Sequence, residues 1–145
     1  MVIIAAVDRS SRADEAVRQA KTLADAFDDT VHVVHVLTRS EFVDLGTKSA
    51  HENKPIDMES VKKAAASIAE EAAAPVDGSF ETVGLVGDPA DRIVDYADTH
   101  DARYITVVGR KRSPAGKAIF GSVGQSVVLG AECPVVLSIN RRKTD

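Results

Sequence analysis

The sequence predicts an α/β fold in which a parallel sheet carries helices on both faces. Five short apolar runs of strand length alternate along the chain with four segments that have helical features. This alternation favours right-handed crossovers between parallel strands. The 145 residues correspond to one ordinary domain, without a repeat or internal linker. We expect this domain over residues 1–140, followed by a frayed tail over 141–145.

The first strand is expected at Val2–Val7, a continuous apolar run that suits a strand buried on both faces. Ser11 can cap the helix that follows, and Asp14 adds negative charge to its first turn. A second strand is expected at Val31–Leu37. The apolar residues of the helix recur at steps of three and four, so they form one stripe: Ala13, Ala16, Val17, Ala20, Leu23, Ala24 and Phe27.

The middle of the chain starts with Arg39–Ile56, which has no clear apolar period and contains Gly, Asn and Pro. We predict a long loop there with one helical turn at most, of the kind that is often functional or mobile. Asp57–Ala73 has helical periodicity and predicts the second helix. Phe80–Val86 predicts a short strand, which we expect at an edge of the sheet.

The next helix has a strong start signal, because Asp88 can cap it and Pro89 can take its first helical position. We expect this helix to run to about His100. The remaining predicted elements are a strand at Tyr104–Val108, a helix at Val123–Gly130 and a last strand at Val135–Ile139.

A basic loop, Gly109–Ser122, joins the Tyr104–Val108 strand to the last helix. A strand, a glycine-bearing basic loop and a helix N-terminus form the arrangement that binds phosphate, because unpaired backbone amides and the helix dipole attract an anion. The alternative is an ordinary surface loop with solvated charges. The cations of the loop are Arg110, Lys111, Arg112 and Lys117.

The composition gives no reason to expect a nucleic-acid or membrane partner. The net charge of −4 gives no reason to expect nucleic acid. No apolar run approaches the roughly 20 residues that cross a bilayer, and the start of the chain lacks the features of a signal peptide. We therefore expect a cytoplasmic protein without a membrane partner. Cys133 is the single cysteine, so no internal disulfide forms, and we expect it to act as a small buried apolar residue.

The standard phosphate-binding and catalytic motifs are missing from the sequence. Lys111 stands where a P-loop needs glycine, and there is no G-x-G-x-x-G. His32 and His35 point to opposite faces of one strand, so they cannot chelate one metal ion. No pair of carboxylates suggests an acid/base couple. We therefore expect no structural metal site and no catalytic residue.

Asp8 follows the first strand, at a position where open parallel sheets bind ligands. Its carboxylate can accept hydrogen bonds from ribose hydroxyls or reach a metal ion on phosphates. The alternative is a turn residue that precedes the helix. The basic loop follows another strand and is placed to meet Asp8 at the same edge of the sheet.

Several motifs in the same order resemble the universal stress protein family over nearly the whole chain. Val7-Asp8-Arg9-Ser10 is similar to the opening V-D-x-S of that family, and Gly87-Asp88-Pro89-Ala90 is similar to its G-D-P-A helix start. Val108–Ser122 and Cys133-Pro134-Val135-Val136 resemble its signature and final strand. The resemblance implies a Rossmann-like sheet of order 3-2-1-4-5 and a homodimer that pairs the last strands.

The ATP-binding branch of that family carries the signature G-x-x-G-x(9)-G-[ST]. This chain keeps its ends, Gly109 and Gly121-Ser122, but it has Arg112 at the second glycine and is one residue shorter. The side chain of Arg112 can hinder close approach of the backbone to phosphate, or it can contribute a guanidinium to phosphate oxygens. The loop alone leaves these two alternatives open.

The resemblance also implies roles for individual residues. Asp8 would contact the ribose and Val36 would pack near the adenine. The phosphates would be lined by Gly109, Gly121 and Ser122, with backbone from Val123 and positive charge from Arg110 and Arg112. The leading hypothesis is thus a stress-response switch occupied by ATP or another adenine nucleotide, with or without Mg²⁺, and with slow hydrolysis at most. The alternative is an interaction module of the same fold, whose basic loop binds an unidentified protein or another anion.

Overall fold

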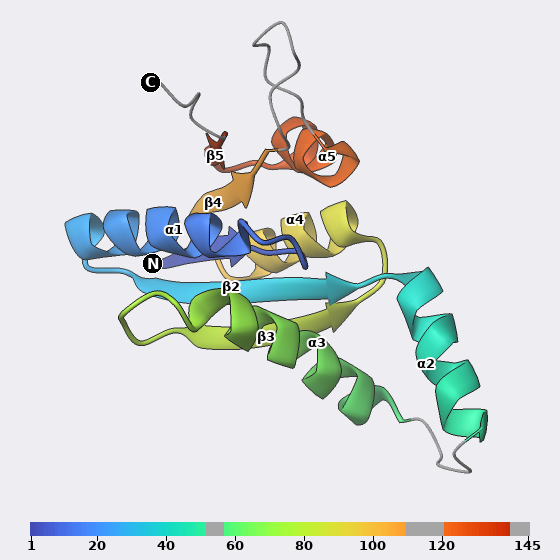
Figure 1. Ribbon diagram of the computed structural model, residues 1–145. Helices are drawn as coiled ribbons and strands as arrows, with labels where there is room; N and C mark the ends of the chain where they lie inside the picture. The colour runs from blue at the N-terminus through green and yellow to red at the C-terminus, as the bar shows by residue number, and fades with distance from the viewer. Residues whose placement is uncertain (52–56, 110–120, 140–145) are drawn as a thin grey trace, which may run out of the picture.

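The computed structural model describes residues 1–51, 57–109 and 121–139, and within these ranges five parallel strands form one sheet (Figure 1). The strand order is β3-β2-β1-β4-β5, which confirms the expected order and direction. The strands are β1 (Val2–Ala6), β2 (Thr30–Leu37), β3 (Glu81–Val86), β4 (Ala102–Val108) and β5 (Val135–Ser138). The helices are α1 (Ala13–Phe27), α2 (Arg39–His51), α3 (Met58–Ala73), α4 (Pro89–Thr99) and α5 (Ser122–Gly130).

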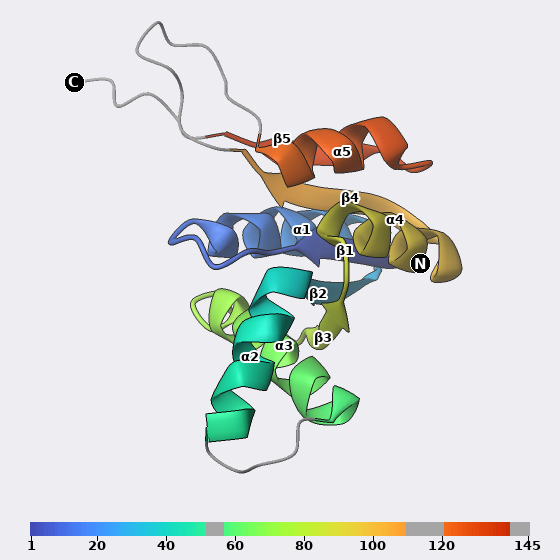
Figure 2. The same ribbon diagram turned by 90° about the vertical axis from the view of Figure 1, so that its right-hand side faces the viewer.

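The sheet separates two apolar cores. On one face, Ile3 and Ala5 of β1 pack with buried alanines of α1 and α3. On the other face, Ile4 of β1 packs with Ile93 of α4 and Val127 of α5. Ile3, Ile4 and Ala5 are all fully buried, as expected for a central strand covered on both faces. Figure 2 shows α4 and α5 stacked beside the sheet, with α2 and α3 near the β3 edge.

The expectation of a loop over Arg39–Ile56 is wrong for its first thirteen residues, which form α2. The helix starts with a capping box, in which the backbone amide of Glu41 donates to Thr38 Oγ1 at 3.2 Å. In return, Glu41 Oε1 accepts from the backbone amide of Thr38 at 3.3 Å. This reciprocal pairing satisfies amides that a first helical turn otherwise leaves unpaired. A Thr-x-x-Glu sequence is therefore a start signal even where apolar periodicity is weak.

The expected cap at Ser11 is also wrong. The N-cap of α1 is Arg12, whose side chain makes no capping hydrogen bond. The carbonyl of Ser10 accepts from the amide of Ala13 at 3.2 Å instead. Phe27, expected in the buried stripe, is 43% exposed and lies beneath the guanidinium of Arg103, 4.4 Å from the ring centre. The rest of the stripe is buried or packed against the core.

The start of α4 follows the sequence expectation. Asp88 Oδ1 accepts from the amide of Asp91 at 3.1 Å, and Pro89 is the first helical residue. β3 is an edge strand, also as expected. Cys133 is half-buried against the α4–α5 core, where burial raises the pKa of its thiol. None of the helices within the described ranges is long and apolar enough to cross a membrane.

Candidate functional site

A cavity of about 350 Å³ opens at the carboxyl ends of β1, β2 and β4. After β1, the chain adds β2 and β3 on one side of β1 and then crosses to add β4 and β5 on its other side. The strand order therefore reverses between β1 and β4. Ligands of open parallel sheets bind at such switch points. The cavity is bounded by the β1–α1 loop, the start of α2 and the N-terminal ends of α4 and α5.

Five of the eight residues expected to bind a ligand line this cavity: Asp8, Val36, Gly121, Ser122 and Val123. They come from three parts of the chain that the sheet brings together. Gly109 does not line it; this residue is buried beside β5, where its amide donates to the carbonyl of Ser138 at 2.7 Å. Arg110 and Arg112 lie outside the described residues.

The N-terminus of α5 supplies the polar end of the cavity. Gly121 is its N-cap, none of the described residues supplies a side-chain cap, and no acidic residue lies in its first turn. The amides of this turn therefore face the cavity region without a competing carboxylate on the same helix, which suits an anion. Gly121 has a φ of −73°, an angle open to any residue, so a need for glycine there would come from close approach of a ligand.

Asp8 lies at the rim of the cavity with an exposed side chain. Its Oδ1 accepts from the backbone amide of Ser10 at 2.9 Å and closes a turn of the Asx type. The turn role and the ligand role are compatible, because the turn engages one oxygen. Over the described residues, Oδ2 has no hydrogen-bond partner and remains able to accept from a ligand.

The inner wall of the cavity is apolar. Val36, Ile93 and Val107 are each about 4% exposed, and Ala6 and Pro89 complete the wall. Apolar walls with a few polar groups at one end are typical of sites for small organic ligands. A flat heterocycle would fit against these side chains, while a charged group would fit against the α5 end.

Sequence reasoning missed the outer wall, where Arg9 of the β1–α1 loop pairs with Glu41 of α2. Arg9 Nη2 lies 2.8 Å from Glu41 Oε2, and both residues line the cavity. The pair was missed because α2 was expected to be a loop, so Glu41 had no expected place near β1. The Thr38-x-x-Glu41 motif is a helix start signal, and it could have predicted that Glu41 lies in the first turn of a helix directly after β2. The cavity is also lined by three residues that the sequence did not suggest as binding residues, namely His35, Thr38 and Pro89.

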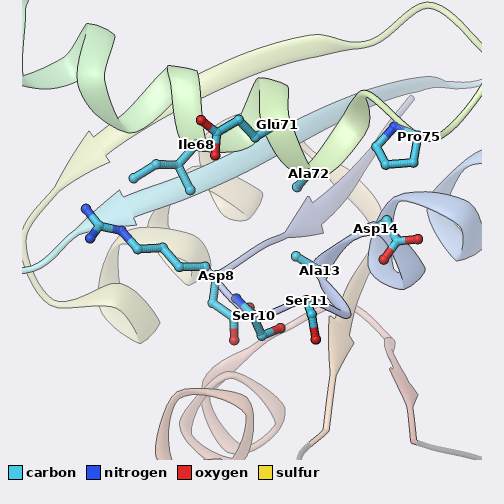
Figure 3. A pocket seen from close by; sticks show the side chains of 10 residues that line it. Asp8, Ser10, Ser11, Ala13, Asp14, Ile68, Glu71, Ala72 and Pro75 are labelled. Atoms are coloured by element: carbon cyan, nitrogen blue, oxygen red, sulfur yellow. The ribbon is translucent and has the colours of Figure 1, made fainter.

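A second cavity, of about 540 Å³, lies between the β1–α1 loop and α3 (Figure 3). Figure 3 shows Ser10 and Ser11 on the loop side and Glu71 on the α3 side. The charged residues that line this second cavity are three carboxylates and one cation: Asp8, Asp14, Glu71 and Arg9. The described lining of the smaller cavity also has more carboxylates than cations, but its helix N-terminus, that of α5, has no acidic residue in the first turn, whereas Asp14 lies in the first turn of α1. The smaller cavity is therefore the better site for an anionic ligand.

The described residues contain no group of three or more side chains that could hold a metal ion. His32 points to the α4 face, where its Nδ1 lies 2.7 Å from Tyr96 Oη and its Nε2 lies 2.9 Å from Glu81 Oε2. Burial lowers the pKa of His32, and Glu81 opposes that shift. His35 belongs to the other face and bonds the carbonyl of Val7. Each of these two histidines thus has a protein partner of its own.

The fold and the cavity define a class: doubly wound α/β proteins with a cavity at the switch point of the sheet. The family model of the universal stress protein family matches residues 1–138. The chain belongs to the universal stress protein family. This confirms the family that the sequence motifs suggested.

Individual relatives agree with this assignment. A universal stress protein of Methanocaldococcus jannaschii is 29% identical over 140 residues, which cover 93% of this chain and 79% of the relative. The structure of a universal stress protein of Archaeoglobus fulgidus is 31% identical with a TM-score of 0.58, and the match covers 94% and 96% of the two chains. A structure of a universal stress protein from Archaeoglobus fulgidus in complex with dAMP is 26% identical, with a TM-score of 0.54 and 94% of each chain covered.

Proposed function

We propose that this protein binds an adenine nucleotide in the switch-point cavity and acts as a stress-response switch. The observation that carries the proposal is that one cavity combines an apolar wall, an accessible carboxylate and an uncapped helix N-terminus. These three features match the three parts of a nucleotide in order: base, ribose and phosphate. The dAMP complex of the Archaeoglobus fulgidus relative supports an adenine nucleotide as the ligand class.

The proposed roles follow the position of each residue. The base packs against Val36 and Ile93, and a ribose hydroxyl donates to Asp8 Oδ2. The phosphates lie at Gly121, Ser122 and the backbone of Val123, where the α5 dipole favours negative charge. The proposal also includes Arg110 and Arg112 as cations near the phosphates, and Gly109 as the residue from which the basic loop departs.

We propose that the site holds ATP or another adenine nucleotide, with or without Mg²⁺, and that it serves occupancy and not rapid turnover. Among the described residues, Asp8 and Glu41 are the two carboxylates that line the cavity. Asp8 accepts from Ser10, and Glu41 pairs with Arg9. Neither is placed as an unengaged general base, which favours a binding role over fast hydrolysis.

A homodimer through β5 is part of the proposal. β5 is an edge strand of four half-buried residues, and the neighbouring α5 exposes Val128 at 41% and Leu129 at 78%. An unpaired apolar edge favours aggregation unless it is covered, and pairing with a two-fold mate would cover it. Light scattering over a concentration series tests this, because a monomer mass at all concentrations would contradict it.

Titration calorimetry with ATP, ADP and AMP, each with and without Mg²⁺, tests the nucleotide proposal. Saturable binding of at least one adenine nucleotide is expected, with GTP as the control for base selectivity. Absence of binding at millimolar concentration would overturn the proposal. The departure at Arg112 favours the second candidate, an interaction module, and the Arg112→Gly variant decides between them. Loss of affinity means that Arg112 holds phosphate, whereas binding that appears only in the variant means that Arg112 blocks the site.

A further inference from the structure

His35 is a buried polar residue whose second ring nitrogen has no partner. The residue is 6% exposed, and its Nδ1 lies 2.8 Å from the carbonyl oxygen of Val7. A carbonyl oxygen can only accept, so in the neutral ring Nδ1 carries the proton and Nε2 carries the lone pair. Within the described part of the chain, Nε2 is shielded from solvent and has no hydrogen-bond partner.

This arrangement is poor for stability alone. A buried acceptor without a donor disfavours the folded state, and Nε2 of His35 is such an acceptor. Unpaired buried groups in a folded protein therefore need another explanation, and functional sites are where such violations are expected. The hydrogen bond from His35 Nδ1 to the Val7 carbonyl indicates the functional role of the imidazole.

The hydrogen bond of His35 holds Val7, the residue directly before Asp8. Val7 follows β1, and its amide donates to the carbonyl of Val34 at 2.9 Å. Its carbonyl accepts from His35, so both polar groups of Val7 are tied to β2. With Val7 fixed on both sides, the backbone has a defined direction where Asp8 begins. The Asp8–Ser10 turn then sets the carboxylate at the cavity rim.

We propose that His35 is a positioning residue, which holds the Val7 carbonyl so that Asp8 faces the ribose of the bound nucleotide. This inference rests on the proposed function. It requires no contact between His35 and the ligand. In this proposal Nδ1 orients the backbone through its bond to Val7, and the position that this bond fixes for the ring leaves Nε2 unpaired.

Two variants separate the hydrogen bond from the bulk of the side chain. His35→Asn keeps an N–H donor at the same number of bonds from Cα as Nδ1, whereas His35→Phe keeps the ring and removes the donor. We expect His35→Phe to weaken ATP binding about five- to tenfold, the ratio for loss of one hydrogen bond, and His35→Asn to retain most of the affinity. The melting temperature without ligand is expected to change little in His35→Phe, because the unpaired Nε2 is removed while the buried carbonyl of Val7 loses its donor.

A double-mutant cycle tests whether the effect passes through Asp8. If His35 acts by orienting Asp8, adding His35→Phe to Asp8→Ala should cause little further loss of affinity. Fully additive losses would overturn the proposal. Equal affinity of His35→Phe and the unmodified protein would overturn it as well. So would a collapse of both His35→Asn and His35→Phe in thermal melts, because His35 would then be structural.

A readout without nucleotide distinguishes failure of this inference from failure of the proposed function. The Ser10 amide bonds to Asp8, so its ¹H–¹⁵N signal and hydrogen exchange report on the turn. We expect faster exchange of this amide in His35→Phe and near-native exchange in His35→Asn. If no variant binds an adenine nucleotide but this pattern holds, the positioning role stands and the ligand is wrong. An unchanged Ser10 amide in His35→Phe would overturn the positioning role itself.

Discussion

Arg12 Nη1 donates to the carbonyl oxygen of Gly109 at 3.0 Å, across 97 positions of the sequence. Gly109 is also held from the other side, because its amide donates to the carbonyl of Ser138. A Cβ at Gly109 would lie 3.3 Å from Ile139 Cγ1, which leaves little space for a side chain. The residue from which the basic loop departs is thus fixed by α1 on one side and by the β5 segment on the other.

Replacing Arg12 with Ala should therefore affect ligand binding as well as stability. Loss of the bond to Gly109 is expected to lower the free energy of unfolding by about 1 kcal/mol and to weaken nucleotide binding severalfold. Chemical denaturation and calorimetry measure the two effects. Arg18→Ala is the control, because Arg18 makes an exposed i,i+4 pair with Asp14 that contributes little. Equal behaviour of the two variants would contradict a role for Arg12 at the site.

Asp8→Ala should weaken nucleotide binding by about 1–3 kcal/mol, the scale for losing a hydrogen bond to a charged group. The melting temperature without ligand should change little, because the side chain is exposed and its turn bond is local. Asp14→Ala, outside the proposed cavity, provides a carboxylate control. A large loss of stability with unchanged affinity would show that Asp8 is a turn residue and nothing more.

Gly121→Val should abolish triphosphate binding, because the branched side chain would occupy the space where phosphate approaches the α5 amides. Ser122→Ala removes one hydroxyl and is expected to cost about 1–2 kcal/mol of binding free energy. Titration calorimetry with Mg-ATP compares the two variants. Since the φ of Gly121 suits any residue, the fold should survive, and a native melting curve for Gly121→Val is the control. Retained affinity in this variant would place the phosphates elsewhere.

Gly84→Ala should destabilise the protein strongly. A Cβ there would overlap the carbonyl oxygen of Lys62 and lie 2.5 Å from the amide nitrogen of Ala66, so α3 would have to move away from β3. Overpacking of this kind costs about 1–3 kcal/mol or more in the free energy of unfolding. Gly46→Ala in α2 is the matched control, because nothing lies within 4 Å of its Cβ position and helix propensity favours Ala. Urea denaturation compares the two, and a Gly84→Ala protein as stable as the unmodified one would contradict the close packing.

His32 should make the stability dependent on pH. Burial lowers the pKa of His32 in the folded state, with Glu81 opposing and His100 adding to the shift. The unfolded chain then binds the proton more readily, so stability is present above about pH 6.5 and is lost as the pH falls toward the folded pKa. Melting temperatures between pH 7.5 and 5.5 are expected to fall less in His32→Phe than in the unmodified protein. Parallel pH profiles for the two proteins would show that His32 does not contribute.

The sequence predicts the framework of this molecule better than its site. Strand positions and the Asp88–Pro89 helix start depend on local signals, namely apolar runs and capping chemistry, and these appear in the structure. Helix α2 was missed because its apolar periodicity is weak and its start depends on a capping box at Thr38. The Arg9–Glu41 pair and the His35 bond to Val7 were missed for a different reason. They join segments far apart in the chain, and their geometry depends on the strand register that only the assembled sheet provides.

The central place of β1 has a consequence for synthesis of the protein on the ribosome. β1 is made first and can pair with β2 once Thr30–Val34 have emerged. Its other side pairs with residues from Ala102 to Thr106, so that side stays open while the roughly one hundred residues from β1 to β4 are translated. At about 5–20 residues per second, this leaves the apolar residues Ile3 and Ile4 incompletely covered for some seconds. The nascent chain is thus most exposed to misassociation before β4 leaves the exit tunnel.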